Sequence, residues 1–422
     1  MNEPSVPSRH SPLLRHRPLR LLITTRVASN TANQMQAVAV GWYVYALTGS
    51  ALALGLIGLV QFLPPLCLTL PSGQIVDHYS RRLILIACYA VEAGVSLGLL
   101  VLATFFSHPV GLVFGLLLVN AVARTFEGPA LQSLVPSTVP REILMRAVSV
   151  YASAGKMSQL LGPALGGLLY ALGAGVDFGL CAFLIGIAGV ASAAMPIPPA
   201  PARRPKVTWA TLVAGVRFIW NEPVMLGAMS LDLVATLFGG VVALLPIFAR
   251  DILHINAWGF GLLRSAPATG ALIVAAGLTR LPVTGAAGRI MFAAVAVYGI
   301  ATIGFGLSDR TGLSLGMLIT VGAGDMLSVV VRQSIMQFAT PDEMRGRVFA
   351  VNSLFNNCAS QIGMFESGVT ADWFGAVGSA VLGGAIVLIV VLVWSWHFRG
   401  LRRVERPEEL ARPTFPLAVE GA

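Results

Sequence analysis

The chain consists of long apolar stretches separated by short polar connections. Turn residues such as those at 48–50 and 108–109, together with charged dipeptides, divide it into segments of about the 20 apolar residues that a membrane-spanning helix needs. These segments cover residues 20–47, 51–76, 83–106, 109–134, 142–172, 176–195, 224–249, 257–279, 289–307, 312–338, 344–371 and 376–398. The pattern predicts an all-α polytopic membrane protein with about twelve transmembrane helices.

The composition agrees with this interpretation. Of the 422 residues, 56% are hydrophobic and only 11% are charged, whereas soluble domains carry about a quarter charged residues. The net charge is +9, and 21 of the 28 Lys and Arg residues lie in the two tails and in alternate connections. The positive-inside rule then places both termini in the cytoplasm. Topology accounts for the basic excess, so no nucleic-acid partner is expected.

The sequence repeats itself at an offset of 201 residues. The matches include Gln132 with Gln333, Pro140 with Pro341, Arg146 with Arg347, and Gly162 with Gly363. The predicted organisation is a tail (1–19), a six-helix bundle (20–195), a cytoplasmic linker (196–223), a second six-helix bundle (224–398) and a tail (399–422). Two pseudo-symmetric halves suggest alternating access to a site between them. A channel, a membrane enzyme or a scaffold would also fit twelve spans.

Motifs for other chemistry are weak. The four cysteines lie singly inside spans, which indicates neither a disulfide framework nor a metal site. Residues 94–98 and 312–316 match the nucleophile-elbow spacing but lack its strand–turn–helix context. A phosphate-binding loop is absent from the sequence. We therefore expect no enzymatic activity and no cofactor.

Ionisable residues inside the predicted spans are the strongest site signal. Each costs about 2.5 to 3.5 kcal/mol at a helix centre unless it faces water or a partner. The basic ones are Arg26, Arg124, Lys156, Arg264 and Arg332; the acidic ones are Glu92, Glu127, Asp232, Asp325 and Glu366. Any one of them is as compatible with a structural pair as with contact to substrate or proton.

Several of these residues share one helical face with other polar residues. The spacing groups Arg26, Asn30 and Asn33; Asn120, Arg124 and Glu127; Asp232 and Thr236; and Asp325, Ser328 and Arg332. Spans 5 and 11 add Lys156, Gln159, Asn356, Asn357 and Gln361. We predict that these residues line a substrate cavity.

Proton coupling has three candidate residues. Asp325 and Arg124 occupy equivalent places in the two halves, because 124 + 201 = 325. A carboxylate that pairs with arginine in one conformation and is desolvated alone in another changes its proton affinity with conformation. Asp325 is the first candidate for the proton carrier, with Glu127 and Asp232 in reserve.

The loop at residues 73–83 resembles the signature loop of the major facilitator superfamily. It has Gly73, then Asp77, then the basic pair Arg81 and Arg82. A carboxylate here can accept hydrogen bonds from a helix N-terminus, and the arginines can clamp carboxylates. We assign to the same cytoplasmic gate Asp342, Glu343, Arg345 and Arg347, which lie on the same side at the start of span 11. Arg81 or Arg82 is expected to pair with Asp342 or Glu343 when this side is closed. A purely topogenic role for the arginines is the alternative.

A second motif resembles the antiporter motif of superfamily exporters. It consists of Gly162, Pro163, Gly166 and Gly167. Proline frees a carbonyl and kinks a spanning helix, while the glycines let another helix pack against its backbone.

Residues 41–55, 140–142 and 341–348 are similar to the bacterial branch that contains enterobactin exporters and macrolide efflux proteins. This resemblance implies export of a small amphipathic compound by proton antiport across a bacterial inner membrane. The expected partners are a small-molecule substrate, protons and the lipid bilayer, with the protein as a monomer. One departure is Asn33, since such exporters often carry a carboxylate in span 1. Import by the same fold and a non-transporting sensor remain the alternatives.

Overall fold

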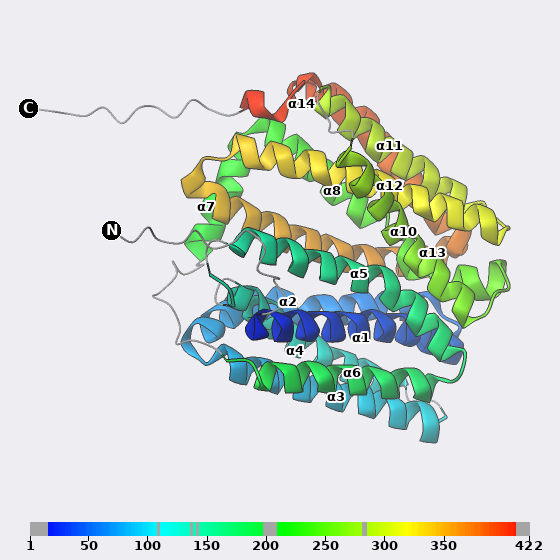
Figure 1. The fold of residues 1–422 in the computed structure, drawn as a ribbon. Coiled ribbons are helices and arrows are strands. Elements are labelled where there is room, and N and C mark those ends of the chain that lie inside the picture. Colours follow the sequence, from blue (N-terminus) through cyan, green and yellow to red (C-terminus); the bar gives the residue numbers. More distant parts are fainter. Residues whose placement is uncertain are drawn as a thin grey trace, which may run out of the picture. The chain divides into compact units, whose positions relative to one another are not determined.

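The computed structural model describes residues 16–107, 110–135, 138–140, 143–196, 209–280 and 285–410, and over these ranges the regular secondary structure is helical (Figure 1). Three groups of predictions lie outside the described residues. They concern residues 1–15 and 411–422 of the two tails, residues 197–208 of the linker, and Arg141 and Glu142 of the resemblance to the exporter branch. The side chain of Asp77 also lies outside the description.

The first six predicted spans are six helices. They are α1 (Arg17–Thr48), α2 (Ala51–His78), α3 (Arg81–Phe105), α4 (Val110–Leu134), α5 (Leu144–Tyr170) and α6 (Ala174–Ala193). Between α1 and α2, Gly49 has a φ of 59°, a left-handed conformation that glycine adopts without a steric penalty. This glycine allows the chain to reverse direction within two residues.

The second group of spans is less regular at its start. Helix α8 (Pro223–Phe238) continues through a 3₁₀ turn (Val241–Leu244), a short α9 (Leu245–Ile247) and a π-helical turn (Phe248–Ile252). The following helices are α10 (Ala257–Leu278), α11 (Ala287–Gly306), α12 (Thr311–Ala339), α13 (Asp342–His397) and α14 (Arg399–Arg403), before a final 3₁₀ turn (Pro407–Leu410). Asn256 caps α10 by accepting a hydrogen bond from the backbone amide of Gly259 at 3.0 Å.

Two predicted spans, 344–371 and 376–398, are joined in α13. Gly375 interrupts the helical backbone with φ 74° and ψ 162°, so α13 has two arms. A further helix, α7 (Trp209–Asn221), lies in the segment predicted as linker. Its apolar residues are unevenly buried: Ile219 is 6% exposed, whereas Trp220 is 70% exposed.

The helices agree with the predicted number of spans. Among the described residues, nine helical segments are long and apolar enough to cross a membrane, and α13 is one of them. Counting the two arms of α13 separately gives ten crossings among the described residues. Helices α1 and α5 have sufficient length but carry charged and polar side chains, among them Arg26 and Lys156. These two complete the twelve predicted spans.

The helices form two compact units. The described residues of 1–40 and 63–206 form the N-terminal unit, and those of 41–62 and 207–422 form the C-terminal unit. The segment 41–62 belongs to the second unit because α2 lies directly against α13 there. A Cβ atom on Gly58 would lie 2.7 Å from the Gln361 carbonyl oxygen. The predicted division had placed this segment in the first bundle.

Each unit has its own apolar core. In the N-terminal unit α3 packs against both α4 and α6 (Figure 1), through buried residues that include Leu85, Tyr89 and Ile185. In the C-terminal unit α11 packs against α12 and α13, with Met291 and Val387 in the core.

The same close packing of two helices is found inside each unit. A Cβ atom on Gly162 of α5 would lie 2.6 Å from Cβ of Gln34 on α1. At the equivalent position, Gly363 of α13 would place its Cβ 2.6 Å from the Leu237 carbonyl oxygen on α8. A glycine therefore lets α5 approach α1 closely in the N-terminal unit, and a glycine lets α13 approach α8 closely in the C-terminal unit.

Candidate functional site

A buried ion pair joins α8 to α12 in the C-terminal unit. A guanidinium nitrogen of Arg332 lies 3.1 Å from the Asp232 carboxylate, and the two side chains are 2% and 5% exposed. Both residues were predicted from the sequence to line a cavity, or to carry protons in the case of Asp232. The structure adds that they contact each other.

Two asparagines of α13 complete this cluster. The Arg332 guanidinium donates to the Asn352 side-chain oxygen at 2.6 Å. In the amide orientation that satisfies both neighbours, Asn356 donates to Asp232 at 3.1 Å and accepts from Arg332 at 3.0 Å. A buried ion pair is stable only when additional hydrogen bonds satisfy its remaining donors and acceptors. The asparagines provide several of these bonds, whereas the Arg332 Nε lacks a partner among the described residues. Three helices therefore meet at one polar cluster.

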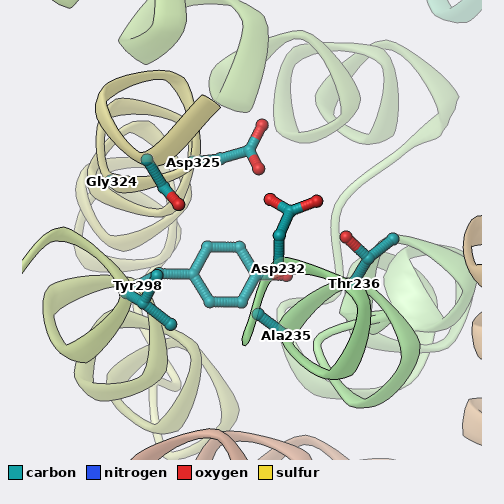
Figure 2. Close-up of a pocket in the computed structure, with 8 residues that line it drawn as sticks. Asp232, Ala235, Thr236, Tyr298, Gly324 and Asp325 are labelled. Atoms are coloured by element: carbon teal, nitrogen blue, oxygen red, sulfur yellow. The ribbon is translucent and has the colours of Figure 1, made fainter. Parts of the chain in front are cut away.

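A small pocket opens beside the ion pair (Figure 2). It is lined by Asp232, Ala235 and Thr236 of α8, Val295 and Tyr298 of α11, and Gly324, Asp325 and Ser328 of α12. Figure 2 shows the carboxylates of Asp232 and Asp325 directed toward the same space. Tyr298 forms one wall, and its hydroxyl donates to the Gly239 carbonyl at 2.9 Å. The pocket thus contains two titratable carboxylates, one of which, Asp232, also pairs with the Arg332 guanidinium.

The N-terminal unit has polar contacts at equivalent positions. The Arg26 guanidinium of α1 lies 5.4 Å from the ring centroid of Tyr151 on α5, and Asn30 donates to the Gly155 carbonyl at 2.9 Å. Adding 201 to 151 and 155 gives 352 and 356, the positions of the two α13 asparagines. At positions 155 and 356 a polar contact therefore joins equivalent helices in the two units, Asn30 of α1 to α5 and Asp232 of α8 to α13.

Further predicted residues lie in the N-terminal unit. Glu127 is 7% exposed and accepts a hydrogen bond from the Tyr89 hydroxyl at 2.9 Å. Asn33 and Asn120 are also buried, whereas Arg124 is exposed. The predicted pairing of Arg124 with Asp325 would join the two units and stays a prediction.

The other cavity candidates are more exposed. Lys156 donates to Gln159 at 3.2 Å, and both side chains are exposed. Asn357 is exposed and Gln361 is partly buried. These residues therefore lie outside the buried cluster of Asp232 and Arg332 and outside the contacts of Arg26 and Asn30.

The predicted gate residues have local partners. Arg81 donates to the Ser133 carbonyl at 3.4 Å, and Asp342 pairs with Arg345 one helical turn away at 2.8 Å. Arg347 contacts the sulfur of Met344 at 3.3 Å. Pairing of Arg81 or Arg82 with the acidic start of α13 stays a prediction.

Three site residues were missed by the sequence analysis. Asn352 stands four residues before Asn356, so helical spacing alone places both on one face. Tyr151 and Tyr298 had no such signal, because an isolated tyrosine in an apolar span is more often a packing residue.

The antiporter-like motif places backbone against backbone. A Cβ atom on Gly166 would lie 2.7 Å from Cα of Met35 on α1. The motif therefore fixes the helix that carries Arg26 and Asn30 against the helix that carries Tyr151.

The chain is similar to a family of membrane secretion proteins and to several efflux proteins. The profile of the family described as "Transmembrane secretion effector" matches residues 7–419. The multidrug efflux pump Tap of Mycolicibacterium fortuitum is 26% identical, covering 92% of this chain and 98% of that protein. The enterobactin exporter EntS of Citrobacter koseri is 27% identical, covering 86% and 84%. Macrolide efflux protein A of Streptococcus pyogenes is 26% identical, covering 84% and 90%.

Solved structures share the fold. A nucleoside transporter, the NupG D323A mutant, aligns with a TM-score of 0.70 at 14% identity, covering 91% of this chain and 99% of that one. A bacterial homolog of the human lysosomal transporter Spinster aligns with a TM-score of 0.71 at 12% identity, covering 94% and 98%. The chain therefore belongs to the transmembrane secretion effector family and is a multi-pass transporter of the major facilitator superfamily.

Proposed function

We propose that this protein exports a small amphipathic compound in exchange for protons, by alternating access across a bacterial inner membrane. The observation that carries the proposal is the pocket lined by Asp232 and Asp325, in which Asp232 also pairs with the buried Arg332. A carboxylate gains a proton when its cationic partner moves away, and loses it when the partner returns. Movement of α8 relative to α12 would make and break such a contact, which couples proton binding to conformation.

Export, and the class of compound, are supported by the relatives. Tap, EntS and macrolide efflux protein A are named as a multidrug pump, an enterobactin exporter and a macrolide efflux protein. The compounds in these names share a mixed polar and apolar character. Asparagine and arginine side chains beside apolar helix faces suit such a compound.

The proposed topology places both termini in the cytoplasm, with the protein acting as a monomer. The basic residues that alternate along the chain support this orientation. In that topology the loop around Asp77 and the start of α13 form the cytoplasmic gate.

The test is transport by the purified protein in proteoliposomes. A thermal-shift screen against erythromycin, ethidium and enterobactin first selects the probe compound. Flux of that probe is then followed with a pH-sensitive dye inside the vesicles. We expect outward flux of the probe with inward movement of protons, and no stimulation by a sodium gradient. Inward flux would indicate an importer, and binding without flux would indicate a sensor.

A further inference from the structure

The N-terminal unit contains two buried carboxylates that the proposed function does not use. Glu92 lies on α3 and Asp177 lies near the start of α6, and both side chains are fully buried. Together with Glu127 they place three carboxylates inside one unit. Polar groups lie around and between these three positions.

Glu92 has an unusual environment. Within the described part of the chain, neither of its carboxylate oxygens has a hydrogen-bond partner. The Asn33 side chain lies against it, and Arg124 and Glu127 are close enough to act on it electrostatically. Asn33 is 6% exposed, and its own oxygen lacks a partner in the same part of the chain. Burying an ionised carboxylate without partners costs far more than burying a neutral one, so these surroundings favour a bound proton at Glu92.

One neighbour of Glu92 leads to Glu127. Tyr89 stands three residues before Glu92, so both lie on the same face of α3. Its hydroxyl donates to Glu127 of α4 at 2.9 Å, and Tyr89 is 1% exposed. A phenol hydroxyl both donates and accepts, which is the property that a proton relay beside Glu127 requires.

On the other side, polar groups continue toward Asp177. Ser96 stands four residues after Glu92 and donates to the Gln36 side-chain oxygen at 3.3 Å. The backbone of Gln36 lies beside Cys181 of α6. The Cys181 thiol lies 3.7 Å from the Asp177 carboxylate and donates to it. One Asp177 oxygen lacks a partner among the described residues.

These groups follow the direction of the helices. From Tyr89 to Ser96 the rise is about 10 Å, and from Cys181 to Asp177 about 6 Å, at about 1.5 Å per residue. The carboxylates therefore stand at successive depths of the unit, with Glu92 between the other two. The side chains that separate them are a phenol, a hydroxyl, two amides and a thiol.

We propose that Glu92 is a proton-binding site at the centre of a polar row that runs from Glu127 to Asp177 within the N-terminal unit. The proposal rests on the proton exchange proposed above and adds a second place, apart from the Asp232 pocket, where the transporter binds its coupling proton. Glu92 is fully enclosed among core residues such as Tyr89 and Leu99, which suits a proton and leaves no room for an amphipathic substrate.

The charged and titratable groups that face Glu92 define its pH dependence. They are Arg124 and Glu127 of α4 and Cys88 and Tyr89 of α3, with the neutral amide of Asn33 on α1. A change at Glu127 therefore alters proton binding at Glu92 directly.

A chemical test needs no transported compound. Dicyclohexylcarbodiimide enters apolar regions and adds to carboxylic acids only in the protonated form, leaving an adduct that peptide mass spectrometry locates. We expect labelling at Glu92 in the wild-type protein that falls as pH rises, and no adduct at this position in Glu92→Gln. The labelling is measured on the wild-type protein, so it does not depend on whether a variant folds. Absence of label at Glu92 at every pH would overturn the proposal.

A transport test separates this inference from the proposed function. With ethidium as probe in proteoliposomes, Glu92→Gln should lose at least tenfold in substrate-driven proton movement while retaining ethidium binding. Asp177→Asn should slow proton movement. The matched control is Glu366→Gln, which changes an intramembrane carboxylate outside the Asp232 pocket and outside the polar row. This control should move protons at the wild-type rate. Wild-type rates in Glu92→Gln would overturn the inference while leaving proton antiport intact. Absence of proton movement in the wild type would instead overturn antiport, and with it the coupling role of Glu92.

Discussion

The Arg332 guanidinium lies 3.1 Å from the Asp232 carboxylate, with both side chains almost completely buried. The two residues are 100 positions apart and lie on α12 and α8. Because α13 supplies Asn352 and Asn356 to the same pair, a movement of any of these three helices changes its geometry. The pair is therefore placed where conformation and protonation influence each other.

Removing one partner of this pair should destabilise the protein. Asp232→Asn strands the arginine charge in a buried place, and breaking a buried pair costs about 3 to 5 kcal/mol. We expect a marked fall in the melting temperature of the detergent-purified protein, measured by thermal shift. The double variant Asp232→Asn with Arg332→Gln removes both charges and should recover most of that loss. Equal melting temperatures for wild type and Asp232→Asn would contradict a structural contribution of the pair.

Asp325 has a different expected effect, because it lines the pocket while its side chain is exposed. Asp325→Asn should abolish export driven by a pH gradient but keep substrate binding and stability. The measurement is substrate-induced proton flux in vesicles, with binding followed in parallel. If flux survives in Asp325→Asn and disappears in Glu127→Gln or Asp232→Asn, the carrier is one of the latter two.

The glycines of the antiporter-like motif should tolerate no side chain. In Gly166→Ala the new Cβ would meet the Met35 backbone at 2.7 Å, and overpacking of this kind costs about 1 to 3 kcal/mol. We expect a lower melting temperature and reduced transport. Gly94→Ala on α3 is the matched control, since a Cβ there meets no atom of the described residues within 4 Å. A similar effect of both substitutions would argue against specific α1–α5 packing.

The cytoplasmic gate can be tested at Asp77. A carboxylate beside a helix N-terminus contributes about 0.3 to 1 kcal/mol when exposed, and about 2 when partly buried. Asp77→Asn should therefore weaken the closed state, lower transport, and raise cysteine labelling from the cytoplasm at Thr236→Cys, with normal expression. Unchanged labelling together with normal transport would remove the gate assignment.

Much of the architecture could be predicted from hydrophobic periodicity. Apolar segments of spanning length predicted the helices, since a bilayer requires about 20 apolar residues per crossing. The 201-residue offset predicted equivalent positions, and Gly162 and Gly363 do pack alike. Helical spacing also identified the polar faces that carry Asp232, Thr236 and Arg332.

Only the tertiary structure decided which of these faces meet. Spacing places Arg332 on a face of its helix, but it does not say which helix lies opposite. Asp232, 100 residues earlier, is its partner because α8 packs beside α12. The same reason explains Glu92, whose polar neighbours Asn33, Arg124 and Glu127 come from α1 and α4. Sequence periodicity determines how one helix is oriented, whereas packing between helices distant in sequence determines what each polar group touches.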